Sequence, residues 1–156
     1  MYKIIKLEDS LDYLQMDDYI RNHQKGHFLQ SPRWSKVKTK WLWRGIMVYQ
    51  KGELSGVLSL LIRRIPFVGA VLYAPRGPVC NRDDWSIMFE FMDAVNKIAS
   101  EHRALVFYLD PDELDSEPAF RKIMTGMGFR EKSHTGFGNL QPQYVFRLNI
   151  CAASKN

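Results

Sequence analysis

The sequence predicts an α+β protein in which one mixed, mostly antiparallel sheet is flanked by helices. Segments with strand and helix periodicity follow one another in the order β-α-α-β-β-β-α-β-α-β. The turn signal Lys51-Gly52-Glu53 separates two apolar runs, which indicates an antiparallel hairpin. With 156 residues, of which 46% are hydrophobic and 25% charged, the chain has the size and composition of one globular domain with its own core.

The first half of the chain is predicted to alternate between strands and short helices. In order, the expected elements are a strand over Tyr2–Leu7, a helix over Ser10–Asn22, a short helix from Pro32 to Lys38, and strands over Ile46–Gln50, Leu54–Arg63 and Ala70–Tyr73. Leu11, Leu14 and Ile20 stand at helical spacings in the first helix. Ser31 before Pro32 supplies the N-cap and the first-turn proline of the second helix.

The second half is predicted to begin with a long amphipathic helix. In order, the expected elements are a helix capped by Asp83 or Asp84 and ending near His102, a strand over Leu105–Leu109, a helix capped by Ser116, a weak strand near Phe129–Ser133 and a last strand over Gln143–Ile150. The apolar stripe of the long helix consists of Trp85, Met88, Phe89, Met92, Val95, Ile98 and Ala99. Gly126 and Gly128 provide the stop signal for the later helix.

Charge is distributed in blocks along the chain, although the net charge is only +5. Residues 19–82 contain twelve basic residues and one acidic residue, Glu53, so that this block carries +11. Residues 83–118 contain ten acidic and two basic residues and carry −8. The basic block suggests an anionic partner such as nucleic acid, a nucleotide, a phosphate or an acidic lipid surface. The alternative is a basic face that pairs internally with the acidic block.

Several classes of protein are not indicated by the sequence. Cys80 and Cys151 have neither metal-ligand spacing nor a disulfide framework, which favours reduced thiols in a cytoplasmic protein. The four histidines also lack ligand spacing, so we expect no metal. No cofactor is expected either. Charged residues interrupt the apolar positions of the N-terminus, which argues against a signal peptide. The uncharged run Ile65–Pro75 is too short to span a membrane, so no transmembrane segment is expected.

The segment Phe28–Lys38 lies inside the basic block and combines cations with aromatic residues. Arg33 and Lys36 in this segment, and Lys40 just beyond it, stand three and four residues apart, which are helical spacings. The nearby tryptophans are Trp34, Trp41 and Trp43. Such cations can hold phosphates, and the tryptophans can stack on a base. The alternative is that the tryptophans belong to the core and the lysines form a solvated face.

The junction Tyr73–Val79 connects a predicted strand to the long helix. The order of the elements matches the acyltransferase fold known as GNAT, whose coenzyme A-dependent members carry a glycine-rich turn at this junction. Backbone N–H groups of that turn cradle the pyrophosphate, whereas Pro75 and Pro78 here remove two donors. The junction therefore argues against coenzyme A. For Arg76, the alternative to a binding role is a loop arginine paired with an acid.

The acidic segment Asp110–Glu113 follows a predicted strand directly. A carboxylate at a strand end is well placed to act as a general base, which makes Asp110 a candidate catalytic residue. The alternative is an acidic cluster favoured by the dipole of the following helix, which would explain Asp115 and Glu117 better than Asp110.

Taken together, these segments resemble the FemABX family of aminoacyl-tRNA-dependent, peptidoglycan-bridge aminoacyltransferases. The similar stretches are Gln30–Lys38, Tyr73–Val79, Phe107–Glu113 and Gly138–Leu148. The resemblance implies that Lys36 contacts the diphosphate of the acceptor and that Asp110 handles the proton of the attacking amine. It also implies that a basic residue belongs at the position of Arg76. The candidate substrate-binding residues are thus Lys36, Arg76 and Trp34.

The resemblance further implies a substrate and a cellular setting. The acceptor would be a peptidoglycan precursor, either lipid II or a UDP-muropeptide, and the donor an aminoacyl-tRNA. A peripheral contact with the inner face of the membrane would follow. Family members have two GNAT-like domains, and we expect residues 1–150 to form the first of them, residues 151–156 to form a short tail, and the second domain to be absent. The expected role is then the acceptor-binding half of the enzyme.

Two functions from other classes remain open from the sequence. A coenzyme A-dependent GNAT N-acyltransferase fits the order of the elements but not the Tyr73–Val79 junction. A non-enzymatic RNA- or anion-binding module would instead use the cations of the basic block together with the tryptophans. Those cations are Lys36, Lys38, Lys40 and Arg44.

Overall fold

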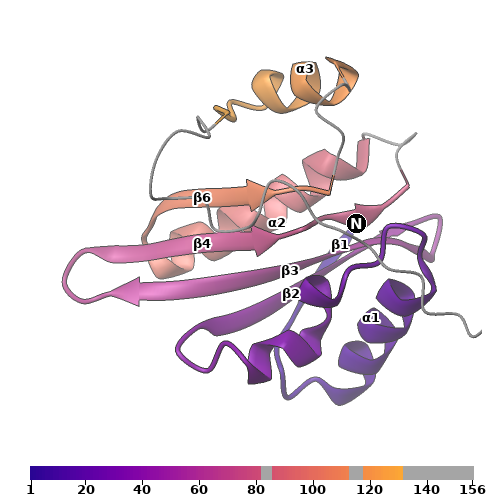
Figure 1. The fold of residues 1–156 in the computed structure, drawn as a ribbon, viewed down its shortest axis with the longest axis horizontal. Coiled ribbons are helices and arrows are strands. Elements are labelled where there is room, and N and C mark those ends of the chain that lie inside the picture. The colour runs from indigo at the N-terminus through magenta and orange to yellow at the C-terminus, as the bar shows by residue number, and fades with distance from the viewer. Residues whose placement is uncertain (82–85, 113–117, 132–156) are drawn as a thin grey trace, which may run out of the picture.

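A computed structural model describes residues 1–81, 86–112 and 118–131 of the chain (Figure 1). The strands are β1 (Tyr2–Ile5), β2 (Leu42–Gln50), β3 (Glu53–Ile65), β4 (Gly69–Pro75), β5 (Val79–Cys80) and β6 (Ala104–Asp110). The helices are α1 (Ser10–Asn22), α2 (Ser86–His102) and α3 (Pro118–Gly126), with 3₁₀ helices η1 (Phe28–Gln30) and η2 (Pro32–Lys36). The predicted α+β class is confirmed.

One mixed sheet forms the centre of the molecule, with the strand order β1-β2-β3-β4-β6. The neighbours from β1 to β4 are antiparallel, β4 and β6 are parallel, and β5 pairs with β3 beside the main path. The helix α2 provides the crossover between β4 and β6, as parallel neighbours require. Pro75 and Asp110 are register partners, so β4 and β6 end side by side.

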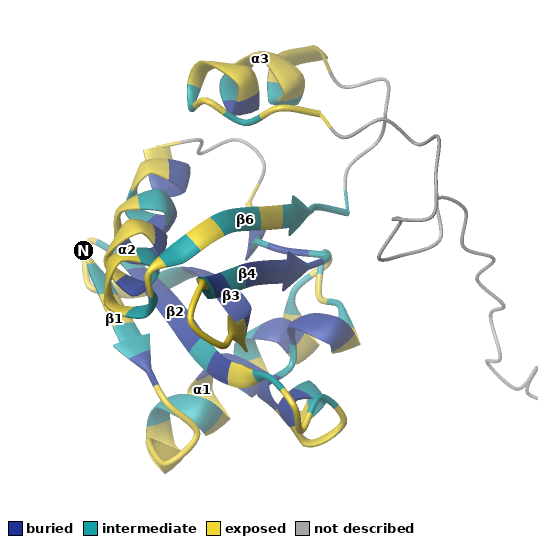
Figure 2. Ribbon diagram, turned by 90° about the vertical axis from the view of Figure 1, so that its left-hand side faces the viewer, coloured by how far each residue is buried: buried dark blue, intermediate teal, exposed yellow. Residues whose placement is uncertain are grey.

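Each face of the sheet is covered by its own helices (Figure 1). Strand residues alternate between the faces: Ile46 and Val48 of β2 pack with α2, whereas Trp43 and Met47 pack with α1. Both faces of β2, β3 and β4 are therefore apolar. Figure 2 shows β4 almost entirely buried, while the neighbouring edge strand β6 alternates between intermediate and exposed residues.

The hairpin between β2 and β3 confirms the turn signal. Lys51 and Gly52 have φ values of 50° and 85°, and two successive positive φ values match the twist of the flanking strands. The strands are longer than predicted, because β2 begins at Leu42 rather than Ile46 and β3 continues to Ile65. Leu42 pairs with Ile62, so backbone pairing with the neighbour extends both strands beyond their apolar periodicity.

Other expectations about the elements had mixed outcomes. The strand β5 was not predicted, since two residues carry no periodicity. The predicted strand near Phe129–Ser133 is wrong for residues 129–131, where the chain instead closes α3: the Phe129 N–H donates to the Met124 carbonyl, and Gly128 has a φ of 87°. The caps at Asp83 or Asp84 and at Ser116, and the strand over Gln143–Ile150, lie outside the described residues.

A buried glutamine joins η1 to the sheet at the point where β3 and β4 separate. The two strands pair from Ile65–Gly69 as far as Leu61–Tyr73. Beyond this point the fully buried Gln30 bridges them: its Nε2 donates to the Pro75 carbonyl at 2.6 Å, and its Oε1 accepts from the Ser59 N–H at 2.8 Å. The amide thus replaces missing strand-to-strand hydrogen bonds.

The surroundings of Gln30 leave no spare room. A Cβ atom on Gly77 would lie 2.6 Å from Gln30 Nε2, so a side chain there would displace the amide. The Ser59 hydroxyl donates to the Gln30 backbone carbonyl and accepts from Trp43 Nε1 at 3.1 Å. Gln30, Ser59 and Trp43 therefore form one buried polar network in an otherwise apolar region.

We expect Gln30→Ala to lower the free energy of unfolding by about 2–4 kcal/mol, because it leaves the Ser59 N–H and the Pro75 carbonyl buried without partners. Urea unfolding measures the loss. The matched control is Gln15→Ala, which removes an exposed glutamine from α1 and should change stability by less than about 0.5 kcal/mol. Equal losses in the two variants would show that the bridge contributes nothing specific.

Candidate functional site

The candidate site lies where the parallel strands β4 and β6 end. Arg76 follows the last residue of β4, and Asp110 is the last residue of β6. Arg76 Nε lies 3.8 Å from Asp110 Oδ2, and Arg76 Nη1 lies 3.8 Å from Asp112 Oδ1. The Arg76 side chain is only 12% exposed, so the guanidinium is held between the two carboxylates at the edge of the sheet. The structure thus brings together two of the predicted site residues.

The carboxyl group of Asp110 is partly shielded from water. Its side chain is 35% exposed, but the Oδ2 atom is buried and accepts no hydrogen bond of good geometry from the described residues. Burial raises the pKa of Asp110 above its usual value, while Arg76 and the Tyr73 hydroxyl oppose the shift. A carboxylate with a raised pKa is a better proton acceptor, which is the property required of a general base.

An aromatic rim lies beside this pair. The rings of His27 and Phe28 stack with centroids 4.8 Å apart, and Phe28 meets Trp34 edge-on at 5.5 Å. Lys38 Nζ lies 5.6 Å from the centre of the Trp34 ring. Gln30 of η1 donates to the Pro75 carbonyl at the end of β4, which places η1 beside the strand ends. Flat rings next to cations suit a ligand that carries both phosphates and planar or apolar groups.

A second aromatic pair continues the rim along β4. Trp41 lies 6.5 Å from Tyr73 between ring centroids, and Arg63 Cζ lies 5.7 Å from the centre of the Trp41 ring. Tyr73 is 5% exposed, with its hydroxyl buried beside Asp110. Tyr73 was not predicted as a site residue, since a tyrosine in a strand ordinarily indicates packing.

The remaining predicted residues occupy different positions. Trp34 is half-buried at the rim, whereas Lys36 ends η2, is exposed and makes no hydrogen bond or ion pair with the described residues. The short helix is 3₁₀ and ends at Lys36 rather than Lys38. Trp43 cannot stack on a ligand, because it is 1% exposed and donates to Ser59. The interpretation of Trp43 as a core residue is therefore the correct one.

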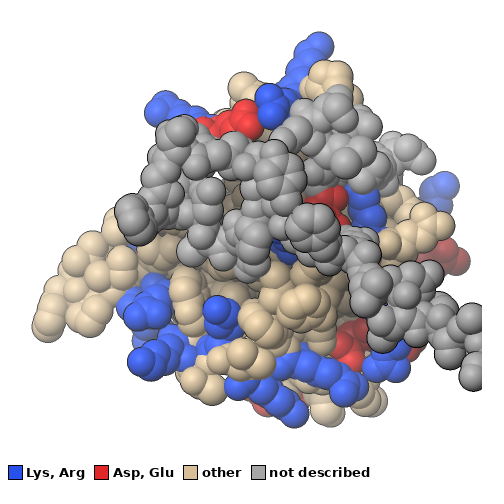
Figure 3. Space-filling model, viewed as in Figure 1, with Lys and Arg blue, Asp and Glu red and all other residues tan. Residues whose placement is uncertain are grey.

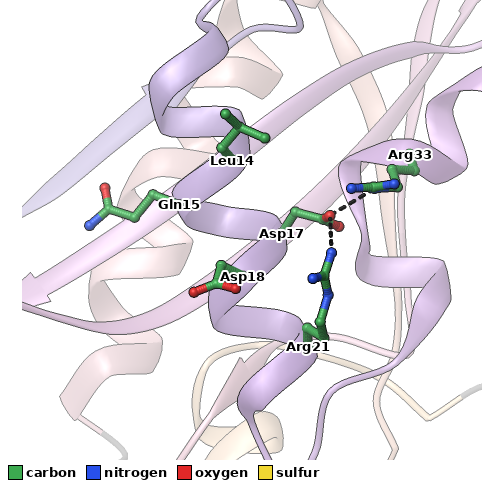
Figure 4. A pocket seen from close by; sticks show the side chains of 6 residues that line it. All are labelled: Leu14, Gln15, Asp17, Asp18, Arg21 and Arg33. Atoms are coloured by element: carbon green, nitrogen blue, oxygen red, sulfur yellow. Dashed lines mark hydrogen bonds and ion pairs between the residues drawn. The ribbon is translucent and has the colours of Figure 1, made fainter.

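Arg33 is engaged by the protein itself rather than directed at a phosphate. Figure 4 shows Arg21 and Arg33 converging on Asp17 of α1 in a shallow depression. Arg33 Nε lies 2.8 Å and Arg21 Nη2 3.5 Å from Asp17 Oδ2, and the Ser31 hydroxyl donates to Asp17 Oδ1 at 2.5 Å. Ser31 also caps η2 by accepting from the Arg33 N–H. Asp17 thus fastens η2, and with it Lys36, to α1.

Asp17 should make stability depend on pH. Burial raises its pKa, but hydrogen bonds from Ser31 and Arg33 outweigh this effect and hold the pKa below its usual value. A lowered folded-state pKa means that the stabilisation is complete above the unfolded value of about 3.9 and is lost as the pH falls through the folded value.

We therefore expect Asp17→Asn to lower the free energy of unfolding by about 2 kcal/mol at pH 7. The difference in the free energy of unfolding between this variant and the unsubstituted chain should shrink below about pH 4, where the Asp17 carboxylate becomes protonated. Denaturant unfolding at several pH values measures both effects. Asp18→Asn, at the exposed neighbouring position, is the control. A loss that is the same at every pH would exclude the charge of Asp17 as its cause.

The junction after β4 differs from a pyrophosphate cradle. Arg76 has a φ of 53°, and the peptide bond between Gly77 and Pro78 is cis. Val79 and Cys80 then pair with Val57 and Gly56 of β3. The chain at this junction is therefore used to extend the sheet, and Pro75 and Pro78 supply no N–H groups.

The described segments offer neither a metal site nor a membrane-spanning helix. No three side chains of His, Cys, Asp or Glu among the described residues come close enough to hold a metal ion. None of the described helices combines the length and the apolar character needed to cross a bilayer.

Comparison with known proteins yields a family match over most of the chain. The FemAB family model matches residues 11–136. A lipid II:glycine glycyltransferase of Staphylococcus haemolyticus is 30% identical over 120 residues, which are 74% of this chain and 29% of that protein. A protein of the same name from Staphylococcus aureus is also 30% identical, over 74% of this chain and 28% of its own length. The chain therefore spans less than a third of the length of these curated relatives.

Solved structures show the same fold. A crystal structure of FemX superimposes with a TM-score of 0.71 and 26% identity, covering 92% of this chain and 35% of that one. An aminoglycoside acetyltransferase from an uncultured soil sample superimposes with a TM-score of 0.64 over 90% of this chain and 98% of that one. Its identity is 9%, so this likeness concerns the fold alone. The predicted GNAT-like fold is confirmed.

Proposed function

The chain belongs to the FemAB family, and we propose that it forms the acceptor-binding half of an aminoacyltransferase that builds peptidoglycan interpeptide bridges. The donor is an aminoacyl-tRNA, and the acceptor is the stem peptide of lipid II or of its nucleotide-linked precursor. The observation that carries the proposal is the meeting of Arg76 and Asp110 at the ends of β4 and β6. The lipid II:glycine glycyltransferases among its relatives support the substrate class.

The reaction joins the amine of the acceptor to the carbonyl carbon of the aminoacyl ester. A C–N bond forms, the C–O bond to the tRNA ribose breaks, and the amine proton must be removed. Asp110 accepts that proton, because burial makes its carboxylate more basic than an exposed aspartate. The proton then passes to the departing ribose oxygen, which leaves as a hydroxyl.

The other residues bind the acceptor. Lys36 contacts its diphosphate as an exposed cation at the end of η2, held in place through Asp17, Ser31 and Arg33. Trp34 offers a flat surface at the rim. Arg76 holds the carboxylate of Asp110 in position. Positioning of this kind is what converts a collision between two substrates into a reaction within one complex. Since charged tRNA is made in the cytoplasm, the chain acts on that side of the membrane.

The proposal predicts that a UDP-linked muramyl pentapeptide binds the chain and raises its melting temperature, whereas acetyl-CoA does not. Lys36→Ala should weaken muropeptide binding by about 1–3 kcal/mol, as expected for a hydrogen bond to a charged group, and added salt should weaken it further. Isothermal titration calorimetry measures both affinities. Lys51→Ala, in the β2–β3 turn, is the matched control for the loss of a surface cation.

Two results would contradict the proposal. If acetyl-CoA binds at micromolar concentration and the muropeptide does not, the chain is a coenzyme A-dependent acyltransferase. If Lys36→Ala and Lys51→Ala bind the muropeptide equally well, η2 is not part of the acceptor site.

A further inference from the structure

The turn between β3 and β4 projects an apolar tip into solvent. The Val68 N–H donates to the Ile65 carbonyl at 3.1 Å and closes the turn. Phe67 is 110% exposed, Val68 56% and Ile65 38%. In Figure 1 this turn is the far left end of the molecule, beyond the helices, and in Figure 3 it forms the uncharged projection at the left edge. Neighbouring apolar residues that all face water commonly mark an interaction site.

The conformation of Phe67 strengthens this interpretation. Its φ of 63° places a large side chain in the left-handed region, which favours glycine or asparagine at this position of a turn. A turn selected only for stability would have a small polar residue here. Phe67 therefore combines an unfavourable backbone conformation with a fully exposed ring, which points to a contact outside the chain.

Basic side chains surround the tip. Arg64 precedes Ile65 in β3 and is exposed, whereas the guanidinium of the neighbouring Arg63 lies over the Trp41 ring. Arg103 borders the same end of the sheet, because its carbonyl accepts from the Ala70 N–H at 3.2 Å. Figure 3 shows Lys and Arg side chains gathered beside the projection.

Arg44 of β2 adds a further cation at the same end of the molecule. Burial, followed by the charges of Arg64 and Arg44, lowers the pKa of His102 at the end of α2. Neither β3 after Glu53 nor β4 contains an acidic residue. The acidic residue that acts on His102 is Glu101. The tip thus combines apolar residues with an excess of positive charge.

We propose that the β3–β4 turn docks on a membrane surface that contains anionic lipids, with Phe67 and Val68 entering the interface and the arginines contacting lipid phosphates. The apolar residues match the acyl-chain boundary of such a surface, and the flanking cations match its anionic headgroups. A nucleic acid would satisfy the arginines, but it offers no apolar surface to the aliphatic side chains of Ile65 and Val68. The docking surface is separate from the site at Asp110, which lies at the opposite end of β4 and β6.

The separation has a consequence for the site. From Gly69 to Pro75, β4 rises by about 20 Å. A chain that stands on the membrane through its β3–β4 turn would therefore hold Arg76 and Asp110 well away from the lipid phosphates. This distance suits an acceptor whose reacting amine stands off the membrane on a sugar and a peptide. That last point rests on the proposed function, whereas the docking itself does not.

Flotation of the 156-residue chain with phospholipid vesicles tests the docking. Vesicles of phosphatidylcholine with about 30% phosphatidylglycerol should bind the chain in a salt-sensitive manner, and pure phosphatidylcholine vesicles should bind it more weakly. Phe67→Asn should weaken binding by at least about tenfold, since the apolar contact is lost while asparagine fits the turn. Arg64→Gln should weaken binding by about fivefold.

The controls are Leu11→Gln, which removes an exposed apolar residue from α1, and Lys51→Gln, which removes a cation from the β2–β3 turn. Neither should affect vesicle binding. The proposal is overturned if anionic vesicles do not bind the chain, or if Phe67→Asn binds as well as Leu11→Gln. It is also overturned if Arg64→Gln weakens the binding of the chain to a single-stranded RNA but not its binding to vesicles. Since the vesicles contain no peptidoglycan precursor, their result is independent of muropeptide binding.

Discussion

The side-chain amide of Gln30 fills the gap where β3 and β4 separate, and the position of the chain beyond Tyr73 depends on it. By bonding to Ser59 on one strand and to Pro75 on the other, Gln30 holds the end of β4 in register with the end of β6. Gly77 is required next to it because any side chain would displace the amide. The contact between Arg76 and Asp110 is a consequence of this arrangement, since both residues leave the sheet at the edge that Gln30 fixes.

The two ends of the sheet then have different surroundings. At one end, Asp110 is a partly buried carboxyl group whose environment raises its pKa, enclosed by Arg76 and Tyr73. At the other end, the β3–β4 turn exposes Phe67 beside an excess of arginine. The positive charge of residues 19–82 is thus divided among distinct uses. Arg33 stabilises α1 through Asp17, Arg76 faces carboxylates, and Arg64 remains at the surface.

Local patterns in the sequence predict much of this fold. The bounds of α1, the Ser31 cap and the β2–β3 turn follow from residues that are close together in the chain, and each is confirmed. Asp110 was recognised because it follows a predicted strand, whereas Arg76 became a candidate through the resemblance to the family. The sequence could not reveal β5, the bridge made by Gln30 or the position of Tyr73, because each depends on strands distant in the sequence. For the same reason, the sequence leaves open whether Trp43 and Arg33 contact a ligand, whereas in the structure Ser59 engages Trp43 and Asp17 engages Arg33.

The most direct test of this account is the pKa of Asp110, followed by carboxyl NMR in the unsubstituted chain, in Gln30→Ala and in Gln15→Ala, under conditions where all three are folded. The account predicts a value above the ordinary one of about 3.9 in the unsubstituted chain and in Gln15→Ala. In Gln30→Ala the value should fall towards the ordinary one, because the released end of β4 no longer shields the carboxyl group from water. An Asp110 pKa that is ordinary in the unsubstituted chain, or that does not change in Gln30→Ala, would contradict the dependence of the site on Gln30.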